Sequence, residues 1–263
     1  MKAVTESVYR LLSRLPPEIR DKGIVLRARN RLRHWEILKL TSPLTPNPAY
    51  HNAIKDRDFK VIFVSPIYNS FPVLAVSLLE QNYDNWELLF VHDGPSDEIG
   101  DIARSLIESD NRIRFIETEH RANDWGHTPR QRGFQEVESE IKGDFLVVSN
   151  SDNYHVPGFI EKMLEAFDDS TDAVLCNMSH DYYSWRNFDT RLEYSFVDCG
   201  CVMARRDIAL AAGWNDNSYE GDWKYVSDLV DQCGVKRFKK LNATLFVLSL
   251  IHISEPTRLR RIS

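Results

Sequence analysis

The sequence predicts an α/β domain built on a mostly parallel sheet with helices on both faces, preceded by an N-terminal helical extension. From Lys60 onward, short apolar runs alternate with helical segments of about ten residues. Such alternation is typical of parallel sheets covered on both faces. An apolar content of 43% and a charged content of 27% are those of an ordinary globular protein, and 263 residues suffice for one sizeable domain.

Short apolar runs are expected to form the strands. The first of them, KVIFVS, is followed by a turn that begins at Pro66, and the run DFLVVS is followed by the polar residues 150–153. The predicted strands cover 60–65, 86–91, 112–117, 144–149 and 173–178.

Helices are expected between and after these strands. In the first of them the apolar residues recur at helical spacing, Ser96 is the expected N-cap of the second, and Pro157 opens the fourth. The predicted helices cover 71–81, 97–109, 130–141, 157–167 and 223–233.

The N-terminal residues 1–58 are predicted to be a basic helical extension and a linker. Residues 1–60 hold 13 Lys and Arg against 6 Asp and Glu, whereas the whole chain has a net charge of −6. The basic side chains concentrate in residues 14–35, and three prolines in residues 40–59 indicate the linker. One interpretation is a solvated helix packed on the domain. The other is an amphipathic helix in peripheral contact with an anionic membrane surface.

The lack of a long apolar stretch and of a secretory signal in this sequence favours a cytoplasmic location. No stretch reaches the roughly 18 apolar residues of a membrane span, and the first residues lack the apolar core of a secretory signal. The four cysteines show no zinc-type spacing and are expected to be reduced thiols. The overall charge balance gives no sign of nucleic-acid binding.

The last residues, 248–263, are expected to be an artefactual tail. Residues 248–258, LSLIHISEPTR, resemble the translation of a transposase-based sequencing adapter. The domain is therefore expected to cover 59–247 and to be truncated at its C-terminus. The alternative is a genuine basic tail.

Polar residues follow three of the predicted strands. Tyr68, Asp93 and Asp152 each come just after a strand end. Ligands of open α/β sheets bind beyond the carboxyl ends of the strands, so these three side chains are expected around one crevice.

The motifs around these residues resemble those of the family 2 glycosyltransferases, which have the Rossmann-like GT-A fold. The resemblance is carried by SPIYN, SLLEQ, VHDGPSD and SNSDNYHVP, together with Arg130, Gly133, Gly143 and Asp144. It covers residues 59–235 and implies an inverting transferase of the hexosyltransferase type. The implied partners are a nucleotide-sugar donor, UDP-linked as the first expectation, and a glycan or other hydroxyl acceptor.

The resemblance implies a set of nucleotide-sugar-binding residues. Tyr68 would offer an aromatic face to the base, and Asp93 would accept hydrogen bonds from the base or the ribose. Arg130 would be a fixed cation near the base or the diphosphate, while Pro66 and Ser151 would line the same site. The structural alternatives are a turn or helix-capping role for Asp93 and a surface position for Arg130.

The resemblance also implies a site for Mg²⁺ or Mn²⁺. The family places a D-x-D motif at the end of the fourth strand, where this chain has Asn150, Ser151 and Asp152. Asp152 fits the second aspartate of the motif. Asn150 keeps an oxygen ligand but removes a negative charge, which should weaken cation binding without a donor. The alternative for Asp152 is a turn aspartate.

The general base is expected at the start of the helix 223–233. Asp222 matches the family's carboxylate best, and Glu220 is second. The alternative is a carboxylate that only stabilises the helix N-terminus.

Cys199 and Cys201 are expected near the acceptor side on opposite faces of a strand, which makes a metal pair improbable.

Two other functions compete with sugar transfer. His92 and Asn150 stand where the family often has acids, which favours a non-catalytic GT-A protein that binds a nucleotide or a partner. His127, in a segment with unusual glycine spacing, fits a site role and a structural role equally. A dinucleotide-dependent oxidoreductase is disfavoured, because no G-x-G-x-x-G follows the first strand.

Overall fold

The computed structural model describes residues 58–68, 73–180, 186–215, 217–218 and 220–248. The predicted extension and linker, apart from Asp58, and the predicted tail, apart from Leu248, lie outside the described residues. No helix in the described part is long and apolar enough to cross a membrane.

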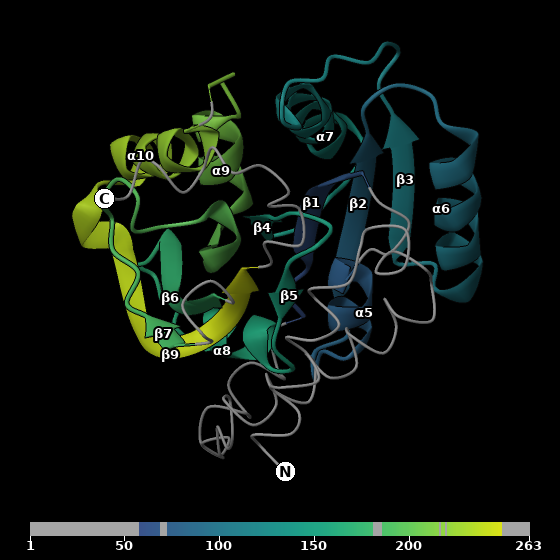
Figure 1. Cartoon of the computed structure of the whole chain (residues 1–263). Coiled ribbons are helices and arrows are strands. Elements are labelled where there is room, and N and C mark those ends of the chain that lie inside the picture. Colours follow the sequence, from purple (N-terminus) through teal and green to yellow (C-terminus); the bar gives the residue numbers. More distant parts are fainter. Residues whose placement is uncertain (1–57, 69–72, 181–185, 216, 219, 249–263) are drawn as a thin grey trace. The chain divides into compact units, whose positions relative to one another are not determined.

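The described residues form one nine-stranded sheet with helices packed against it (Figure 1). The strands are β1 Val61–Ile67, β2 Trp86–His92, β3 Ile113–Glu117, β4 Phe145–Val148, β5 Tyr154–His155, β6 Ala173–His180, β7 Arg186–Phe188, β8 Val202–Arg205 and β9 Phe238–Leu248. They lie in the order β3-β2-β1-β4-β8-β6-β9-β5, and β7 pairs with β6.

Each predicted helix overlaps a helix of the structure, whereas the helix Arg206–Ala212 was not predicted. The helices are α5 Val73–Leu79, α6 Asp97–Ser109, α7 His127–Ser139, α8 Phe159–Glu165, α9 Arg206–Ala212 and α10 Gly221–Cys233, with the short 3₁₀ helices η2 Cys199–Cys201 and η3 Val235–Arg237. Ser96 is the N-cap of α6, as predicted, since its side chain accepts a hydrogen bond from the backbone N–H of Ile99.

The first half of the sheet is parallel, as the alternating pattern predicts. Strand β1 pairs in parallel with β2 and β4, and β2 pairs in parallel with β3. Every residue of β1, β2 and β4 is buried, which explains why these strands read as continuous apolar runs. Helix α7 packs on β1 and β2, and α6 packs on β3.

The turn predicted at Pro66 is wrong, because β1 continues to Ile67 and Pro66 pairs with Val91 of β2. The pairing of β1 with β4 ends at Val64 and Val148. Beyond Val64 the strand therefore has a ladder partner on one side only, a position in which proline is tolerated.

The second half of the sheet is mixed. Strand β8 runs antiparallel to β4 and β6, and β7 runs antiparallel to β6, whereas β9 runs parallel to β6. Cys199 and Cys201 lie in η2 and not in the strand that was expected. Their side chains still diverge, since the thiol of Cys199 contacts Asp222 and that of Cys201 contacts Cys176.

A buried histidine joins β5 to η2. His155 is fully buried beside the rings of Phe63, Phe159 and Phe246. This burial lowers the pKa of His155 to about 4, so the ring is neutral. Its Nε2–H donates to the carbonyl oxygen of Gly200 at 3.0 Å. The contact fixes η2 beside the segment that follows β4.

Gly200 is expected not to tolerate a side chain. A Cβ at this position would lie 2.5 Å from Cε2 of Phe246, inside the packed core. Gly200→Ala should lower the free energy of unfolding by about 1–3 kcal/mol through overpacking. Urea unfolding would measure this loss.

Gly100→Ala is the matched control. Gly100 lies inside α6, where an added Cβ meets no atom within 4 Å. Alanine should raise stability there by about 0.5–1 kcal/mol, because it loses less conformational freedom in a helix. Equal effects of the two substitutions would contradict the packing described for Gly200.

Candidate functional site

The site lies where three parallel strands end. Tyr68 follows β1, Asp93 follows β2, and Asn150, Ser151 and Asp152 follow β4. Because β1 pairs in parallel with both β2 and β4, these residues come to the same edge of the sheet.

Asp93 organises the loop that follows β3. It is 4% exposed, and its two carboxylate oxygens accept hydrogen bonds from the backbone N–H groups of Ala122 and Asn123, at 2.8 and 2.7 Å. Asn123 and Trp125 have φ values of 53° and 57°, which are unusual for residues other than glycine. Asp93 therefore stabilises a strained loop at the edge of the site. Backbone strain of this kind often marks functional regions.

His92 supports the turn next to Asp93. Its Nδ1–H donates to the carbonyl oxygen of Gly94 at 2.6 Å, and the N–H of Gly94 donates to Oγ1 of Thr118 at 2.7 Å. At this position, where the related family often has an acid, the histidine closes a backbone turn.

Arg130 is a buried cation at the centre of the site. It lies in α7 and is 5% exposed. Its Nη1 donates to the carbonyl oxygens of Trp125 and Gly126 at 3.1 and 3.0 Å, and its Nη2 donates to Oδ1 of Asn150. The guanidinium carbon lies 4.7 Å from the centre of the Trp214 ring. These contacts exclude the alternative of a surface arginine.

Tyr68 extends over Gly126. The residue is 46% exposed, but its hydroxyl oxygen would be only 2.0 Å from a Cβ at Gly126. Gly126 has a φ of 84°, so both its conformation and this close approach require glycine. Desolvation raises the pKa of Tyr68, and the carboxylates of Asp93 and Asp124 act in the same direction. The hydroxyl is therefore a hydrogen-bonding group and not an anion.

His127 and Trp214 connect α7 to the chain before α10. Both are buried, and Nε1–H of Trp214 donates to Nδ1 of His127 at 2.9 Å. The Trp214 ring also packs on Tyr225. Of the two interpretations of His127, this geometry favours the structural one.

The segment after β4 supplies polar groups from a largely buried loop. Asn150 contacts Arg130 through its amide oxygen, so this oxygen lies against a guanidinium. Ser151 is buried, and its carbonyl oxygen accepts from the N–H of Leu74 at 3.0 Å. Asp152 is half-buried, and its charge adds to the effects of burial and of Asp222 that raise the pKa of Asp198.

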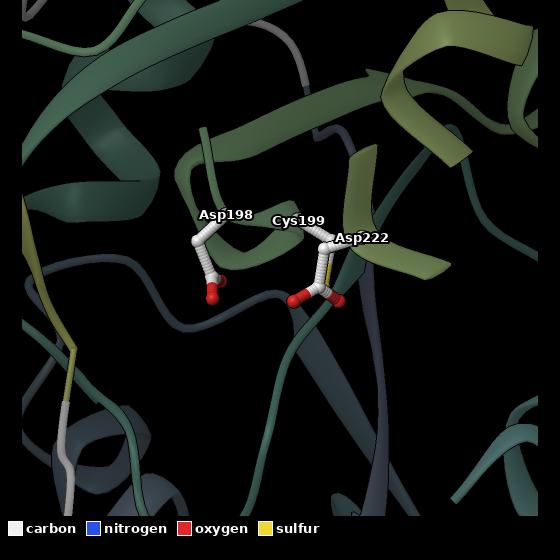
Figure 2. Close-up of side chains that lie close together, drawn as sticks. All are labelled: Asp198, Cys199 and Asp222. Carbon is white, nitrogen blue, oxygen red and sulfur yellow. The ribbon is translucent and has the colours of Figure 1, made fainter. Parts of the chain in front are cut away.

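An acidic cluster stands beside these groups. Asp198 precedes η2, Cys199 begins it, and Asp222 lies in the first turn of α10; one ligand atom from each lies within 4.8 Å of the others. Figure 2 shows Cys199 and Asp222 side by side, with Asp198 across from them and both carboxylates extending in the same direction. The thiol of Cys199 donates to Oδ1 of Asp222 at 3.2 Å.

Burial and charge determine the protonation of this cluster. Burial, and secondarily the charge of Asp222, raise the pKa of Asp198 well above its ordinary value. Burial likewise raises the pKa of Cys199, so the sulfur is a thiol. A neutral thiol is a poor ligand for hard cations such as Mg²⁺. The cluster is better suited to holding a proton than to holding a metal through sulfur.

Glu220 lies just outside the cluster. It is exposed at the N-terminus of α10, and its Oε1 accepts from the hydroxyl of Tyr194 at 2.6 Å. Of the two predicted candidates for the general base, Asp222 is the one that lies beside the buried groups.

Two residues of the site, Asp198 and Trp214, were missed from the sequence, whereas Cys199 was expected near the acceptor side. Asp198 immediately precedes η2, and Trp214 precedes the helix of Asp222 by several residues. The one usable signal was the carboxylate of Asp198 immediately before the Cys-Gly-Cys triplet.

A separate hollow of about 270 Å³ lies between β9 and residues 189–192. Its basic groups are already bonded within the protein: Lys240 donates to Oγ1 of Thr190 at 2.5 Å, and Lys239 donates to the carbonyl oxygen of Ala166 at 2.9 Å. The strand ends therefore remain the better candidate site.

Residues 62–241 match the family described as glycosyl transferase family 2. The chain is 33% identical to EpsH of Bacillus subtilis (strain 168) over 123 residues, which are 46% of this chain and 34% of EpsH. It is 26% identical to glycosyltransferase GlyG of Streptococcus pneumoniae serotype 4 over 199 residues, which are 74% of this chain and 60% of GlyG. The chain thus spans less than two thirds of either relative.

Solved structures share the fold at low identity. One is the mannosyltransferase PcManGT from Pyrobaculum calidifontis in complex with GDP-Man and Mn²⁺, with a TM-score of 0.57, 15% identity, and coverage of 93% of this chain and 68% of that one. Another is glucosyl-3-phosphoglycerate synthase from Mycobacterium tuberculosis with Mn²⁺, UDP and glucosyl-3-phosphoglycerate, with a TM-score of 0.52, 13% identity, and coverage of 83% and 81%. These likenesses confirm the predicted GT-A fold class.

Asp93→Asn should loosen the loop after β3. An amide presents only one acceptor oxygen, so one of the two backbone N–H groups loses its partner, at a cost of about 1–3 kcal/mol. Amide hydrogen exchange should become faster at residues 121–126 and stay unchanged in α6. Glu98→Gln, which removes an exposed charge, is the control. Unchanged exchange in Asp93→Asn would contradict the anchoring role.

Asp198→Asn should change how stability depends on pH. The folded Asp198 carboxyl keeps its proton to a higher pH than the unfolded one, which ionises near pH 4. Above about pH 4 the folded state therefore binds more protons, and stability is lost as the pH rises through the raised pKa. Asparagine removes this contribution while keeping an oxygen for the N–H of Gly200.

Urea unfolding at pH 5 and pH 8 measures the effect. The stability of Asp198→Asn relative to the wild type should rise with pH. Asp207→Asn, at an exposed position, should show no such trend. An identical pH dependence in the wild type and Asp198→Asn would rule out the raised pKa.

Proposed function

The chain belongs to glycosyl transferase family 2, and we propose that it transfers a sugar from a nucleotide-sugar donor to a hydroxyl group of a carbohydrate-type acceptor, with inversion at the anomeric carbon. The observation that carries the proposal is the position of Asp222. It is a half-buried carboxylate in the first turn of α10, and it belongs to the acidic cluster beside the strand-end residues.

In this proposal the donor lies over the ends of β1, β2 and β4. Tyr68 presents a half-exposed ring for the base. Asp93 uses both oxygens on the loop backbone, and each oxygen keeps a further lone pair for the base or the ribose. Pro66 and Ser151 flank these groups. Arg130, whose guanidinium is fixed by the loop carbonyl oxygens, would bind the diphosphate.

The residues present fit a divalent cation that is shared with the donor. Asp152 is a hard oxygen donor. Burial is the main cause of the raised pKa of Asp198, and the charges of Asp222 and Asp152 add to it, so negative charge gathers here and favours a cation. Asp152 would hold Mg²⁺ or Mn²⁺, with Asn150 as the second predicted ligand. The cation would supply positive charge for the departing diphosphate.

Asp222 acts as the general base in the proposed reaction. Its Oδ1 accepts from the thiol of Cys199, which fixes the carboxylate and leaves Oδ2 for the acceptor hydroxyl. As the acceptor oxygen attacks the anomeric carbon, Asp222 takes its proton, and the bond to the diphosphate breaks on the opposite side. Glu220 is the second candidate for this role.

The structural neighbours support a nucleotide-sugar donor without deciding its base. One is described with GDP-Man and Mn²⁺, and the other with UDP and Mn²⁺. A UDP-linked donor stays our first expectation for this chain. The competing proposal is a non-catalytic protein that binds a nucleotide, which the amide of Asn150 in contact with Arg130 favours. A cytoplasmic location and peripheral membrane contact through the basic N-terminal segment stay predictions.

Asp222→Asn should abolish transfer while nucleotide binding persists. The amide keeps the size of the side chain but cannot take the acceptor proton, so the rate should fall by about 10²–10⁴-fold. The measurement is donor turnover against a panel of UDP- and GDP-linked sugars with Mn²⁺, together with calorimetric titration of the same nucleotides.

Glu220→Gln is the matched control, because it removes an exposed carboxylate two residues away. It should keep most of the wild-type rate. Equal background turnover in the wild type and Asp222→Asn would favour the non-catalytic alternative, and a large loss in Glu220→Gln alone would move the base to Glu220.

A further inference from the structure

Arg130 is a buried charge that no carboxylate in the described part of the chain neutralises by direct contact. The side chain is 5% exposed, and it donates hydrogen bonds to two backbone carbonyl oxygens and to the amide oxygen of Asn150. Its Nε is covered and has no hydrogen-bond partner among the described residues. Burying a guanidinium without a counter-charge costs on the order of several kcal/mol. Stacking on Trp214 offsets only a part of that cost.

Asn150 occupies the position from which a carboxylate could form an ion pair with Arg130. Its Oδ1 accepts from Nη2 of Arg130 and so orients the guanidinium, but the amide carries no charge. An aspartate has the same size and would make the same contact as an ion pair. One amide in place of a carboxylate therefore leaves Arg130 without a direct ion pair at the end of β4, and Asp198 acts on its charge only from a distance.

The groups around Arg130 restrict its orientation. The carbonyl oxygens of Trp125 and Gly126 hold Nη1, and Trp214 covers one face. The strained loop 122–126 that carries these carbonyls is itself fixed by Asp93. The guanidinium is thus pre-oriented, and an anion that binds it does not have to order the side chain.

We propose that Arg130 binds the diphosphate of the nucleotide without help from a divalent cation, and that Asn150 determines this property by holding Arg130 without neutralising it. The inference rests on the proposed nucleotide-sugar function. A diphosphate is an anion whose oxygens suit the planar fork of arginine. Because Asn150 is neutral, the segment after β4 offers a cation one carboxylate, that of Asp152, so the nucleotide would bind before the cation.

The test is calorimetric titration of the full chain with UDP and with GDP, once in EDTA and once in Mn²⁺. The wild type should bind at least one of the two nucleotides in EDTA. The corresponding nucleoside, which lacks the diphosphate, should bind much more weakly. Titration with Mn²⁺ alone should give weaker binding than titration with Mn²⁺ after the nucleotide.

Asn150→Asp is the decisive variant. It should weaken binding in EDTA by about tenfold or more, because the new carboxylate competes with the phosphate for Arg130. Binding in Mn²⁺ should be retained or become stronger. Asn217→Asp adds the same charge at an exposed position, and it should change nucleotide binding neither in EDTA nor in Mn²⁺. Asn150→Ser, which stays neutral, should keep binding in EDTA far better than Asn150→Asp does.

The outcomes separate this inference from the proposed function. Nucleotide binding that requires Mn²⁺ in the wild type overturns the inference and leaves the proposed function intact. Equal binding of the wild type and Asn150→Asp in EDTA, or equal losses in Asn150→Asp and Asn217→Asp, also overturns it. The absence of binding in both EDTA and Mn²⁺ overturns both proposals.

Discussion

The contact between Arg130 and Asn150 is the interaction on which the rest of the site depends. It joins α7 to the end of β4, and the same guanidinium holds two carbonyl oxygens of the loop 122–126. Its stacking on Trp214 reaches the segment that leads into α10 and Asp222. A single buried cation thus positions the groups proposed to bind the donor relative to the group proposed to accept the proton. A side chain with so many fixed contacts can bind a ligand at little cost in conformational entropy.

Charge balance distinguishes this site from one built on two strand-end carboxylates. Burial and the charge of Asp222 raise the pKa of Asp198. The positive charge of Arg130, which does not contact Asp198 directly, lowers that pKa. The site therefore places a buried cation and a proton-holding carboxyl close together. Burying both groups costs free energy, and binding of an anionic ligand with its cation would offset a part of that cost.

The first half of the fold was predictable because each of its elements has a local cause. The buried strands β1, β2 and β4 read as apolar runs, Ser96 caps α6, and parallel pairing brings the strand ends to one edge. The second half was not predictable in the same way. Strands β8 and β9 are placed by antiparallel and long-range pairing with β6, which leaves no local pattern in the sequence.

The site shows the same division. Tyr68, Asp93 and Asp152 could be placed from their positions after strands, whereas Asp198 and Trp214 enter the site only through tertiary packing. For Asp93, the sequence indicated the location, but the structure adds a second role, since both oxygens already accept hydrogen bonds from backbone N–H groups.

A crystal structure with bound UDP or GDP tests the account most directly. The account predicts the base beside Tyr68 and Asp93 and the diphosphate within hydrogen-bond distance of Arg130; a nucleotide bound away from the ends of β1, β2 and β4 would contradict it.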